Sequence, residues 1–403
     1  MVYSEDYKKL VDATALKDKY YEIDERVEEI CKEAFKGCDK LEEIVMPKKL
    51  KKIDSEAFQG CSSLTKLTLP DSVTSIGKGA FWGCTGLTEL TLSNGLKSIL
   101  KEVFWGCTGL TELTLPKKLK SIGNDAFRGC TGLTELTLPN SVTSIGEYAF
   151  HNCTGLAKLT LPDSVTSIGD HAFEGCTGLT ELTLPNSVTS IGDCAFADCS
   201  GLEKIMVESG NSRYDSRDNC NSIIDKKTNT LIVGCKNSII PNSVTNIGSG
   251  AFAYCSGLTE LTLPDSITSI GDYAFAYCSD LSKITSLAEI PPVCGSGVFD
   301  GVNKTNCELI VPVISVIAYK QAEVWNEFSN ISGFSGVEDT VADGNTIRAI
   351  GNQIEISGDF TSVEVYGING ALIYKGKDNV VTVPSAGIYL VHVAGKTRKI
   401  VVE

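Results

Sequence analysis

The stretch Leu87–Cys107 reads LTELTLSNGLKSILKEVFWGC, and it contains one unit of a pattern that recurs along most of the chain. Each unit ends in a cysteine three residues after a phenylalanine, and these cysteines are 23 residues apart except for one gap of 56. The ten cysteines at this position are Cys38, Cys61, Cys84, Cys107, Cys130, Cys153, Cys176, Cys199, Cys255 and Cys278. A unit this short cannot bury its own apolar face and must stack on copies of itself. The sequence therefore predicts a right-handed solenoid of about ten coils.

Within the unit, Leu87, Leu90 and Leu92 form the L-x-x-L-x-L signature of a leucine-rich repeat strand. Alternation along a strand places Leu90 and Leu92 inside, with Glu89 and Thr91 outside. The rest of the unit returns to the next strand, and A-F-x-x-C is long enough for about one helical or 3-10 turn. We therefore expect an α/β-type leucine-rich repeat solenoid, made of short parallel strands and short helical or 3-10 return arms.

The pattern C-x-x-L-x-x-L-x-L-P-x-x-V-x-x-I-G-x-x-A-F-x-x-C resembles the BspA-like, or Treponema-type, leucine-rich repeats of bacterial surface proteins. The resemblance extends from about residue 23 to residue 281. It implies an extracellular or outer cell-surface location and a role in protein binding or adhesion. The partners that it implies are host extracellular-matrix proteins or other cells, with a carbohydrate ligand as the other class. A spacer or display module without a specific ligand is the alternative function.

The repeated cysteines have three interpretations. As a ladder of reduced thiols they serve as small buried apolar residues, which is the reading we prefer. Disulfides between neighbouring coils would be strained, because stacked strands hold their Cβ atoms slightly too far apart. A zinc site is disfavoured, since no C-x-x-C spacing occurs.

The 56-residue gap between Cys199 and Cys255 contains an insertion at about residues 209–237. Its segments SIID and TLIV predict a hairpin in which Asp225 pairs with Thr230. That register would bring Cys220 opposite Cys235, the one pair for which we consider a disulfide. The insertion either extends the fold without a binding role or adds a loop to a binding face.

The repeats are flanked by segments of different character. Residues 1–22 are expected to cap the first coil as a helix, residues 23–290 to form the solenoid, and residues 291–334 to cap its other end. In that second cap we expect a strand over Glu308–Val311 and a helix from about Val316 to Phe328. Residues 335–345 indicate a linker, being rich in glycine, serine and acidic residues.

Residues 346–403 alternate apolar and polar side chains, which predicts a small all-β antiparallel sandwich. Asn369-Gly370 is typical of a tight hairpin turn between residues 363–366 and 371–374. The segments VEVYGINGALIY, PSAGIYLVHV and KTRKIVVE resemble the C-terminal sorting domains of the type IX secretion system of Bacteroidetes, apart from Gly367, where that family often has Asp. A stabilising β-domain without a targeting role is the alternative.

Composition argues against several classes of function. The formal net charge of -14 repels phosphate backbones, so neither nucleic acid nor an anionic membrane is expected as a partner. No stretch of transmembrane length and no signal peptide occurs in this chain. Catalytic and nucleotide-binding motifs are missing as well, and the histidines read as surface residues, so we expect no enzyme, cofactor or metal site. We expect a monomer.

Specificity can be encoded only by residues that are exposed, and above all by those that depart from the repeat consensus. Trp82 and Trp105 occupy the same position in neighbouring coils and predict two stacked indoles, either exposed for binding or partly buried against the return arm. Met206 interrupts a row of threonines next to the insertion. The candidate binding residues are Trp82, Trp105, Met206, Arg213 and Tyr214, together with Glu89, Thr91, Glu112, Thr114, Glu135 and Thr137 of the outward strand face.

Overall fold

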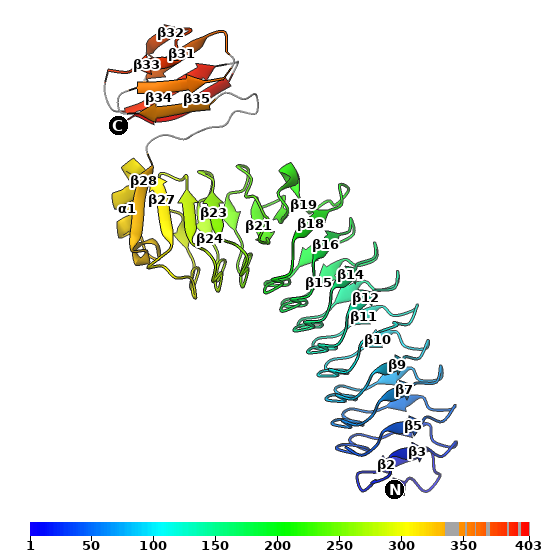
Figure 1. The fold of residues 1–403 in the computed structure, drawn as a ribbon. Coiled ribbons are helices and arrows are strands. Elements are labelled where there is room, and N and C mark those ends of the chain that lie inside the picture. Colours follow the sequence, from blue (N-terminus) through cyan, green and yellow to red (C-terminus); the bar gives the residue numbers. More distant parts are fainter. Residues whose placement is uncertain are drawn as a thin grey trace. The chain divides into compact units, whose positions relative to one another are not determined.

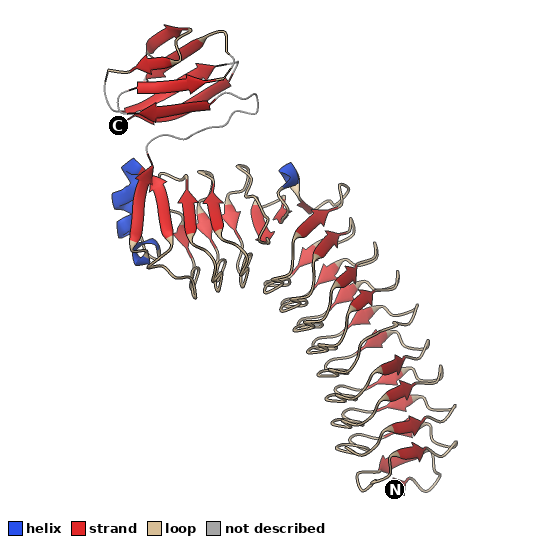
Figure 2. Cartoon of the chain, in the orientation of Figure 1, coloured by secondary structure: helices blue, strands red, loops and turns tan. Residues whose placement is uncertain are grey.

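The computed structural model describes residues 1–334, 346–350, 353–358, 360–367, 371–384, 387–393 and 396–402. The chain divides into two compact units. The first contains Met1–Ser282 and Pro292–Asn303, and the second contains Lys283–Pro291 and Lys304–Glu403. The repeats form a parallel-strand solenoid of about 14 turns with little helix, as Figures 1 and 2 show. The predicted solenoid is confirmed, and it has more turns than the cysteine count suggested because the flanking segments also coil.

The first strand of each coil is the L-x-L strand, and these strands form the strand face of the solenoid. Register is exact at 23 residues, as in Lys66↔Glu89 and Thr137↔Thr160. In the first unit these strands are β3 (Tyr20–Glu22), β5 (Glu43–Val45), β7 (Lys66–Thr68), β9 (Glu89–Thr91), β12 (Glu135–Thr137), β14 (Lys158–Thr160), β16 (Glu181–Leu184), β18 (Lys204–Val207) and β23 (Glu260–Leu263). The coil of Glu112 has only an isolated bridge here, between Thr91 and Thr114.

Each return arm contains a second, two-residue strand, so the expectation of helical or 3-10 return arms is wrong. These strands pair in parallel from coil to coil, as in Ser121↔Ser144. They are β4 (Glu29–Ile30), β6 (Lys52–Ile53), β8 (Ser75–Ile76), β10 (Ser98–Ile99), β11 (Ser121–Ile122), β13 (Ser144–Ile145), β15 (Ser167–Ile168), β17 (Ser190–Ile191), β22 (Asn246–Ile247), β24 (Ser269–Ile270) and β26 (Val293–Cys294).

The segment between this second strand and the cysteine consists of successive tight turns. Gly79 and Gly83 have positive φ values of 62° and 72°, which no α-helix contains. Backbone N–H groups alternate in direction: Trp82 donates to the Gly79 carbonyl within the turn, whereas Phe81 donates to Val103 of the next coil. Helical N–H groups would all bond within their own segment. The alternation therefore holds adjacent coils together along what we call the return-arm face.

A column of phenylalanines fills the core behind the return-arm face. Phe104, Phe127 and Phe150 are fully buried, and each ring stacks on the next with centroids 5.3 Å apart. Inward leucines of the strand face and the ladder cysteines pack around this column. The stacked phenylalanines extend from Phe35 to Phe196 and again from Phe252 to Phe299, on either side of the insertion.

One coil interrupts the second row of strands. A Cβ atom at Gly77 would lie only 2.3 Å from the Ser55 nitrogen, so the two coils approach each other closely there. Leu100 occupies the equivalent position, and its side chain is 43% exposed. The sheet of the first coils ends at β8, and the next sheet begins at β10, the strand that Leu100 follows. The break coincides with Leu100, although Asp54 at the same position leaves the pairing of β6 with β4 intact.

Both irregular segments of the first unit form strands. β1 (Val2–Tyr3) pairs antiparallel with β2 (Lys9–Asp12), which in turn extends the second row, so the expected N-terminal helix is wrong. In the insertion, β19 (Tyr214–Asp215), the 3-10 helix η1 (Arg217–Asn219), β20 (Ile223–Asp225) and β21 (Thr230–Val233) follow one another. Asp225 pairs with Thr230, which confirms the predicted hairpin. β21 then pairs in parallel with β22, so the hairpin lies within the sheet instead of projecting from it.

The second unit begins with three parallel strands and three short helices. β25 (Lys283–Ser286), β27 (Glu308–Pro312) and β28 (Asn330–Phe334) pair in that order. The helices are η2 (Val313–Ser315), α1 (Val316–Gln321) and η3 (Trp325–Glu327). The predicted strand over residues 308–311 is confirmed, whereas the predicted helix ends early because Ala322 is extended. Tyr319 and Trp325 are fully buried.

The residues from 346 onward form two antiparallel sheets around one apolar core. The first sheet contains β29 (Thr346–Ile350), β30 (Gln353–Ser357) and β33 (Val380–Thr382), and the second β32 (Leu372–Gly376), β31 (Val363–Gly367), β34 (Gly387–Val393) and β35 (Lys396–Val402). Ile354, Val365 and Val391 are fully buried between them. β31 and β32 pair as predicted, while their Asn369-Gly370 turn and the expected linker at 335–345 lie outside the described residues.

Candidate functional site

The strand face carries two regular rows of exposed side chains. One row consists of glutamates interrupted by lysines, and Lys66 lies 2.9 Å from Glu89 while Lys204 lies 3.7 Å from Glu181. Threonines follow each other in the second row. The candidates Glu89, Thr91, Glu112, Thr114, Glu135 and Thr137 all lie on this face and are exposed, as predicted. Because the rows repeat almost unchanged, they offer little to distinguish one ligand from another.

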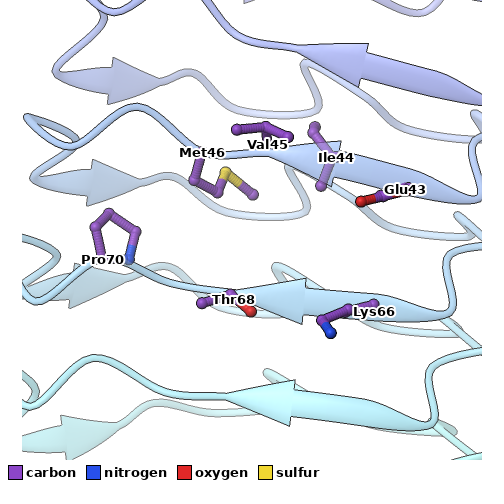
Figure 3. A pocket seen from close by; sticks show the side chains of 7 residues that line it. All are labelled: Glu43, Ile44, Val45, Met46, Lys66, Thr68 and Pro70. Atoms are coloured by element: carbon purple, nitrogen blue, oxygen red, sulfur yellow. The ribbon is translucent and has the colours of Figure 1, made fainter.

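A hollow of about 250 Å³ lies on the strand face between β5 and β7 (Figure 3). Glu43 pairs with Lys66, but no further pair connects these two strands, so they diverge beyond it. The residues that line the hollow are Glu43, Ile44, Val45, Met46, Lys66, Thr68 and Pro70. Sequence reasoning missed it, although Val45 and Met46 depart from the threonine and leucine of other coils. Its few polar groups belong to the regular charged row and converge on no common point.

The return-arm face holds the variable residues. Trp82 and Trp105 stack with ring centroids 4.9 Å apart and planes 10° from parallel. Both side chains are partly buried, which agrees with the second of the two interpretations above. The guanidinium carbon of Arg128 lies 4.9 Å from the Trp105 centroid and 5.2 Å from that of Tyr148. Two indoles, a guanidinium and a phenol thus follow one another across four coils.

The series of Trp82, Trp105, Arg128 and Tyr148 continues into a polar cluster that sequence reasoning did not find. His171 stacks on Tyr148 at 4.6 Å, and His151 meets the same ring edge-on at 5.3 Å. One carboxylate oxygen of Glu174 lies 2.7 Å from Nδ1 of His171 and 3.3 Å from Nδ1 of His151. Burial acts to raise the pKa of Glu174, but the two imidazoles outweigh it, and the pKa lies below its ordinary value. These histidines are therefore partly buried members of a cluster, which corrects their reading as isolated surface residues.

We call this column the return-arm ladder. Its members are Trp82, Trp105, Arg128, Tyr148, His151, His171 and Glu174. They occupy two positions of the repeat, one directly after the phenylalanine and one two residues before it. Those positions vary from coil to coil, and this variation was the sequence signal that could have found the whole ladder. Within the described residues, no group of histidine, cysteine and acidic side chains has the arrangement of a metal site.

The candidates beside the insertion separate in the structure. Met206 is 42% exposed on β18, and Asn221 of the insertion accepts a hydrogen bond from the neighbouring Ile205 nitrogen at 2.6 Å. Tyr214 is only 3% exposed, and its hydroxyl accepts a hydrogen bond from the Ile191 nitrogen. Tyr214 therefore ties the insertion to the preceding coil and cannot serve as a binding residue.

Arg213 binds the carboxylate of Asp225 through two nitrogens, at 2.6 and 3.0 Å. This pair joins the start of β19 to the end of β20, and the two isoleucines of β20 are fully buried. The insertion is thus part of the core of the solenoid. Of the three candidates Met206, Arg213 and Tyr214, only Met206 presents an apolar surface that the rest of the fold does not engage.

The ladder cysteines line the core as free thiols. Apart from Cys255, their sulfur atoms donate to a carbonyl of the preceding coil, as Cys130 does to Phe104 at 3.2 Å. Burial raises the pKa of Cys153 to about 12 and that of Cys130 well above its ordinary value. Cys220 and Cys235 are also free, and Cys235 accepts a hydrogen bond from Asn221 at 3.2 Å. The disulfide considered for that pair is not present.

Comparison with known proteins agrees with this architecture. Residues 15–134, 97–224 and 222–309 match the model of the BspA type leucine rich repeat region, with six copies. The match extends over more than half of the chain, so this protein belongs to the BspA-type leucine-rich repeat family. No protein in the curated set that we compared matches the chain.

Solved structures of bacterial proteins share the fold. A leucine-rich repeat protein from Bacteroides ovatus has 27% sequence identity and a TM-score of 0.54, and the match covers 78% of this chain and 84% of that one. A leucine rich cell surface protein from Faecalibacterium prausnitzii has 24% identity and a TM-score of 0.54, with 79% and 88% of the two chains covered. None of the helices in the described part of the chain has the length and apolar character needed to cross a bilayer.

Proposed function

We propose that this protein is a secreted or surface-displayed binding protein that attaches to a partner protein through its return-arm ladder. The observation that carries the proposal is the stacked series Trp82, Trp105 and Arg128, at a position where other coils have unrelated residues. Tryptophan, tyrosine and arginine dominate the binding energy of protein interfaces. The uniform part of the strand face from Lys66 to Lys204 presents no tryptophan, tyrosine or arginine in its two outward rows. Membership of a family that contains a cell-surface relative supports the location.

A protein partner fits the ladder better than a carbohydrate. Sugars bind aromatic residues by stacking on exposed ring faces, but here each indole covers one face of the other. The second face of Trp105 lies against Arg128. Both faces of Trp105 are therefore covered, and indoles beside a guanidinium suit the mixed polar and apolar surface of a protein. Extracellular-matrix proteins or the surface proteins of other cells are the partners that we propose.

The C-terminal β-domain serves, in this proposal, as a sorting domain for export by a type IX secretion system. Its two antiparallel sheets around a shared core are compatible with that role. The alternative is a stabilising domain without a targeting role. For the whole chain, the alternative to binding is a spacer that holds another module away from the cell.

Replacing both Trp82 and Trp105 with alanine should weaken partner binding at least tenfold, because it removes the aromatic anchor of the ladder. The full chain would be titrated onto a panel of immobilised extracellular-matrix proteins and onto intact cells, and its affinity measured for each surface that it saturates. Thr114→Ala with Thr137→Ala is the matched control on the strand face and should change affinity less than twofold. Circular dichroism should show that all variants stay folded.

Charge reversal of Glu112 and Glu135 shows whether the partner binds the strand face or the return-arm ladder. If these changes abolish binding while the tryptophan variant retains it, the strand face is the binding site and the proposal is wrong. If the wild-type chain saturates none of the surfaces, the spacer function is favoured.

A further inference from the structure

Three exposed tyrosines lie on the return-arm face of the later coils, beyond the return-arm ladder. Tyr254, Tyr273 and Tyr277 are 40%, 52% and 48% exposed. The rings of Tyr254 and Tyr277 stack at 4.5 Å, with planes 13° apart. No hydrogen bond engages the three hydroxyls anywhere in the described part of the chain. Folding within the chain therefore leaves this aromatic surface without a partner.

Two of the tyrosines, Tyr254 and Tyr277, occupy a position that most coils fill with glycine. Tyr254, Tyr273 and Tyr277 have φ values of 60°, 55° and 59°, in the left-handed region that disfavours any residue with a Cβ. At the position of Tyr254 and Tyr277, most other coils have a glycine with φ between 71° and 75°, namely Gly37, Gly60, Gly83, Gly106, Gly129, Gly175 and Gly301. Two bulky aromatic residues in succession are therefore not what the turn itself requires.

The next coil makes room for two of the rings. A Cβ atom at Gly297 would lie 2.5 Å from Cε1 of Tyr273, and one at Gly301 would lie 2.7 Å from Cδ1 of Tyr277. These glycines let both rings lie against the backbone of the following coil. The three tyrosines thus form a supported platform of aromatic side chains, not a set of loose surface residues.

Charge on this part of the return-arm face has one sign. The turn segments 145–153, 168–176, 191–199, 247–255, 270–278 and 294–302 contain no lysine or arginine. Their acidic residues are Glu147, Asp170, Glu174, Asp193, Asp198, Asp272 and Asp300. Among the described residues, only Glu174 of these has an ion-pair partner, and that partner is histidine. Earlier coils differ, since Lys36 pairs with Glu56 there and Lys101 with Asp125.

Three of these carboxylates adjoin the tyrosines. Asp272 directly precedes Tyr273. The backbone carbonyl of Asp300, in the next coil, accepts a hydrogen bond from the Tyr277 N–H. The Asp198 N–H donates to Ala253, which precedes Tyr254. Lys236, which precedes these coils in the chain, is held by Glu203 at 2.8 Å. We call Tyr254, Tyr273, Tyr277, Asp198, Asp272 and Asp300 the acidic tyrosine face.

We propose that the acidic tyrosine face is a second binding site, and that it takes an arginine-rich segment of a partner protein. A guanidinium packs against aromatic rings and pairs with carboxylates at the same time, so one side chain satisfies both features of the surface. A lysine ammonium would gain the charge attraction with less of the ring contact. Anionic ligands are repelled. The site is independent of the return-arm ladder, and it stands even if the ladder binds nothing.

The test uses the full chain and a synthetic ten-residue peptide of alternating arginine and glycine, titrated by fluorescence anisotropy at 150 mM salt. We expect saturable binding that is at least fivefold tighter than for the lysine–glycine peptide of equal length, and no binding of the glutamate–glycine peptide. Failure of the arginine peptide to saturate at millimolar concentration would overturn the proposal, and so would equal affinity for the lysine peptide.

Tyr254→Gly with Tyr277→Gly is the decisive variant, because glycine is the residue that other coils use at this position. We expect at least a tenfold loss of affinity for the arginine peptide, with an unchanged or higher Tm. Tyr254→Phe with Tyr277→Phe should retain most of the affinity. A lower Tm with unchanged affinity would assign the tyrosines a structural role and overturn the proposal.

A charge-matched pair of variants excludes simple attraction to an acidic protein. Asp272→Asn with Asp300→Asn should weaken peptide binding at least tenfold, whereas Glu112→Gln with Glu135→Gln, which removes two carboxylates from the strand face, should weaken it less than twofold. Equal effects of the two pairs would show that the peptide responds to net charge alone and would overturn the proposal. None of these substitutions touches Trp82 or Trp105, so this test and that of the proposed function fail separately.

Discussion

Raising the pH above about 9 should unfold the solenoid steeply, because all ten ladder cysteines are held as neutral thiols. Burial is the main cause that raises the pKa of each, to about 12 for Cys153, Cys255 and Cys278. In the unfolded chain a thiol ionises near its ordinary pKa of about 8.5–9. The folded pKa is the higher one, so this contribution to stability is complete below pH ~8.5 and is lost as the pH rises from there toward the folded pKa.

The size of the effect follows from linkage. Each thiol contributes a slope of about 1.4 kcal/mol per pH unit in that window. If the coils unfold together, ten thiols give a loss on the order of 10 kcal/mol per pH unit. Thermal unfolding followed by circular dichroism from pH 7 to 11, with absorbance at 240 nm to detect thiolate, measures it. Thiolate should appear only with unfolding, and a Tm that stays constant up to pH 10.5 would contradict the account of a buried thiol ladder.

Phe127→Ala should reduce the free energy of unfolding by about 3–5 kcal/mol, the usual cost of emptying a buried phenylalanine site. Phe127 is fully buried and stacks on a phenylalanine of each neighbouring coil at 5.3 Å. The coils cannot close the cavity, because their backbones are held by hydrogen bonds on both sides, including that from the Phe127 nitrogen to Ala149. The neighbouring coils should therefore lose stability with it.

Urea unfolding of the full chain measures this loss, and Thr137→Ala on the strand face is the control. That threonine is exposed, and its replacement should change stability by no more than about 0.5 kcal/mol. Hydrogen exchange should show faster opening of the coils on either side of residue 127. A loss below about 1 kcal/mol for Phe127→Ala would mean that the phenylalanine column does not carry the core.

The 23-residue period was enough to predict the solenoid, the inward leucines and the register of the strand face. A period states which residues lie above one another, so Glu135 opposite Lys158 followed directly from counting. The return arm was predicted wrongly because A-F-x-x-C has the length and composition of a helical turn. Its left-handed residues decide otherwise, and several of them, such as Glu102 and Asp125, are not glycine. A left-handed backbone conformation at a glutamate cannot be predicted from the composition of the sequence.

Most residues of the return-arm ladder were likewise not recognised from the sequence. Trp82 and Trp105 were found because they share one position of the repeat, and Arg128, His151 and Glu174 occupy that position in the next three coils. Tyr148 and His171 belong to a different position. It lies three residues earlier, a spacing that brings two side chains together in a helix as well, so the variation at both positions was an available signal. Tyr214 was misjudged because nothing in the sequence showed that the insertion folds into the core.

Partner binding is expected to use the variable return-arm face and to spare the uniform strand face. Oxidative side-chain footprinting of the full chain tests it most directly, with and without the extracellular-matrix protein of the panel that it binds most tightly. Trp82 and Trp105 report on the return-arm face, and Met206, which is 42% exposed, reports on the strand face. We predict at least threefold protection of both tryptophans and unchanged oxidation of Met206; protection of Met206 with unprotected tryptophans would contradict the account.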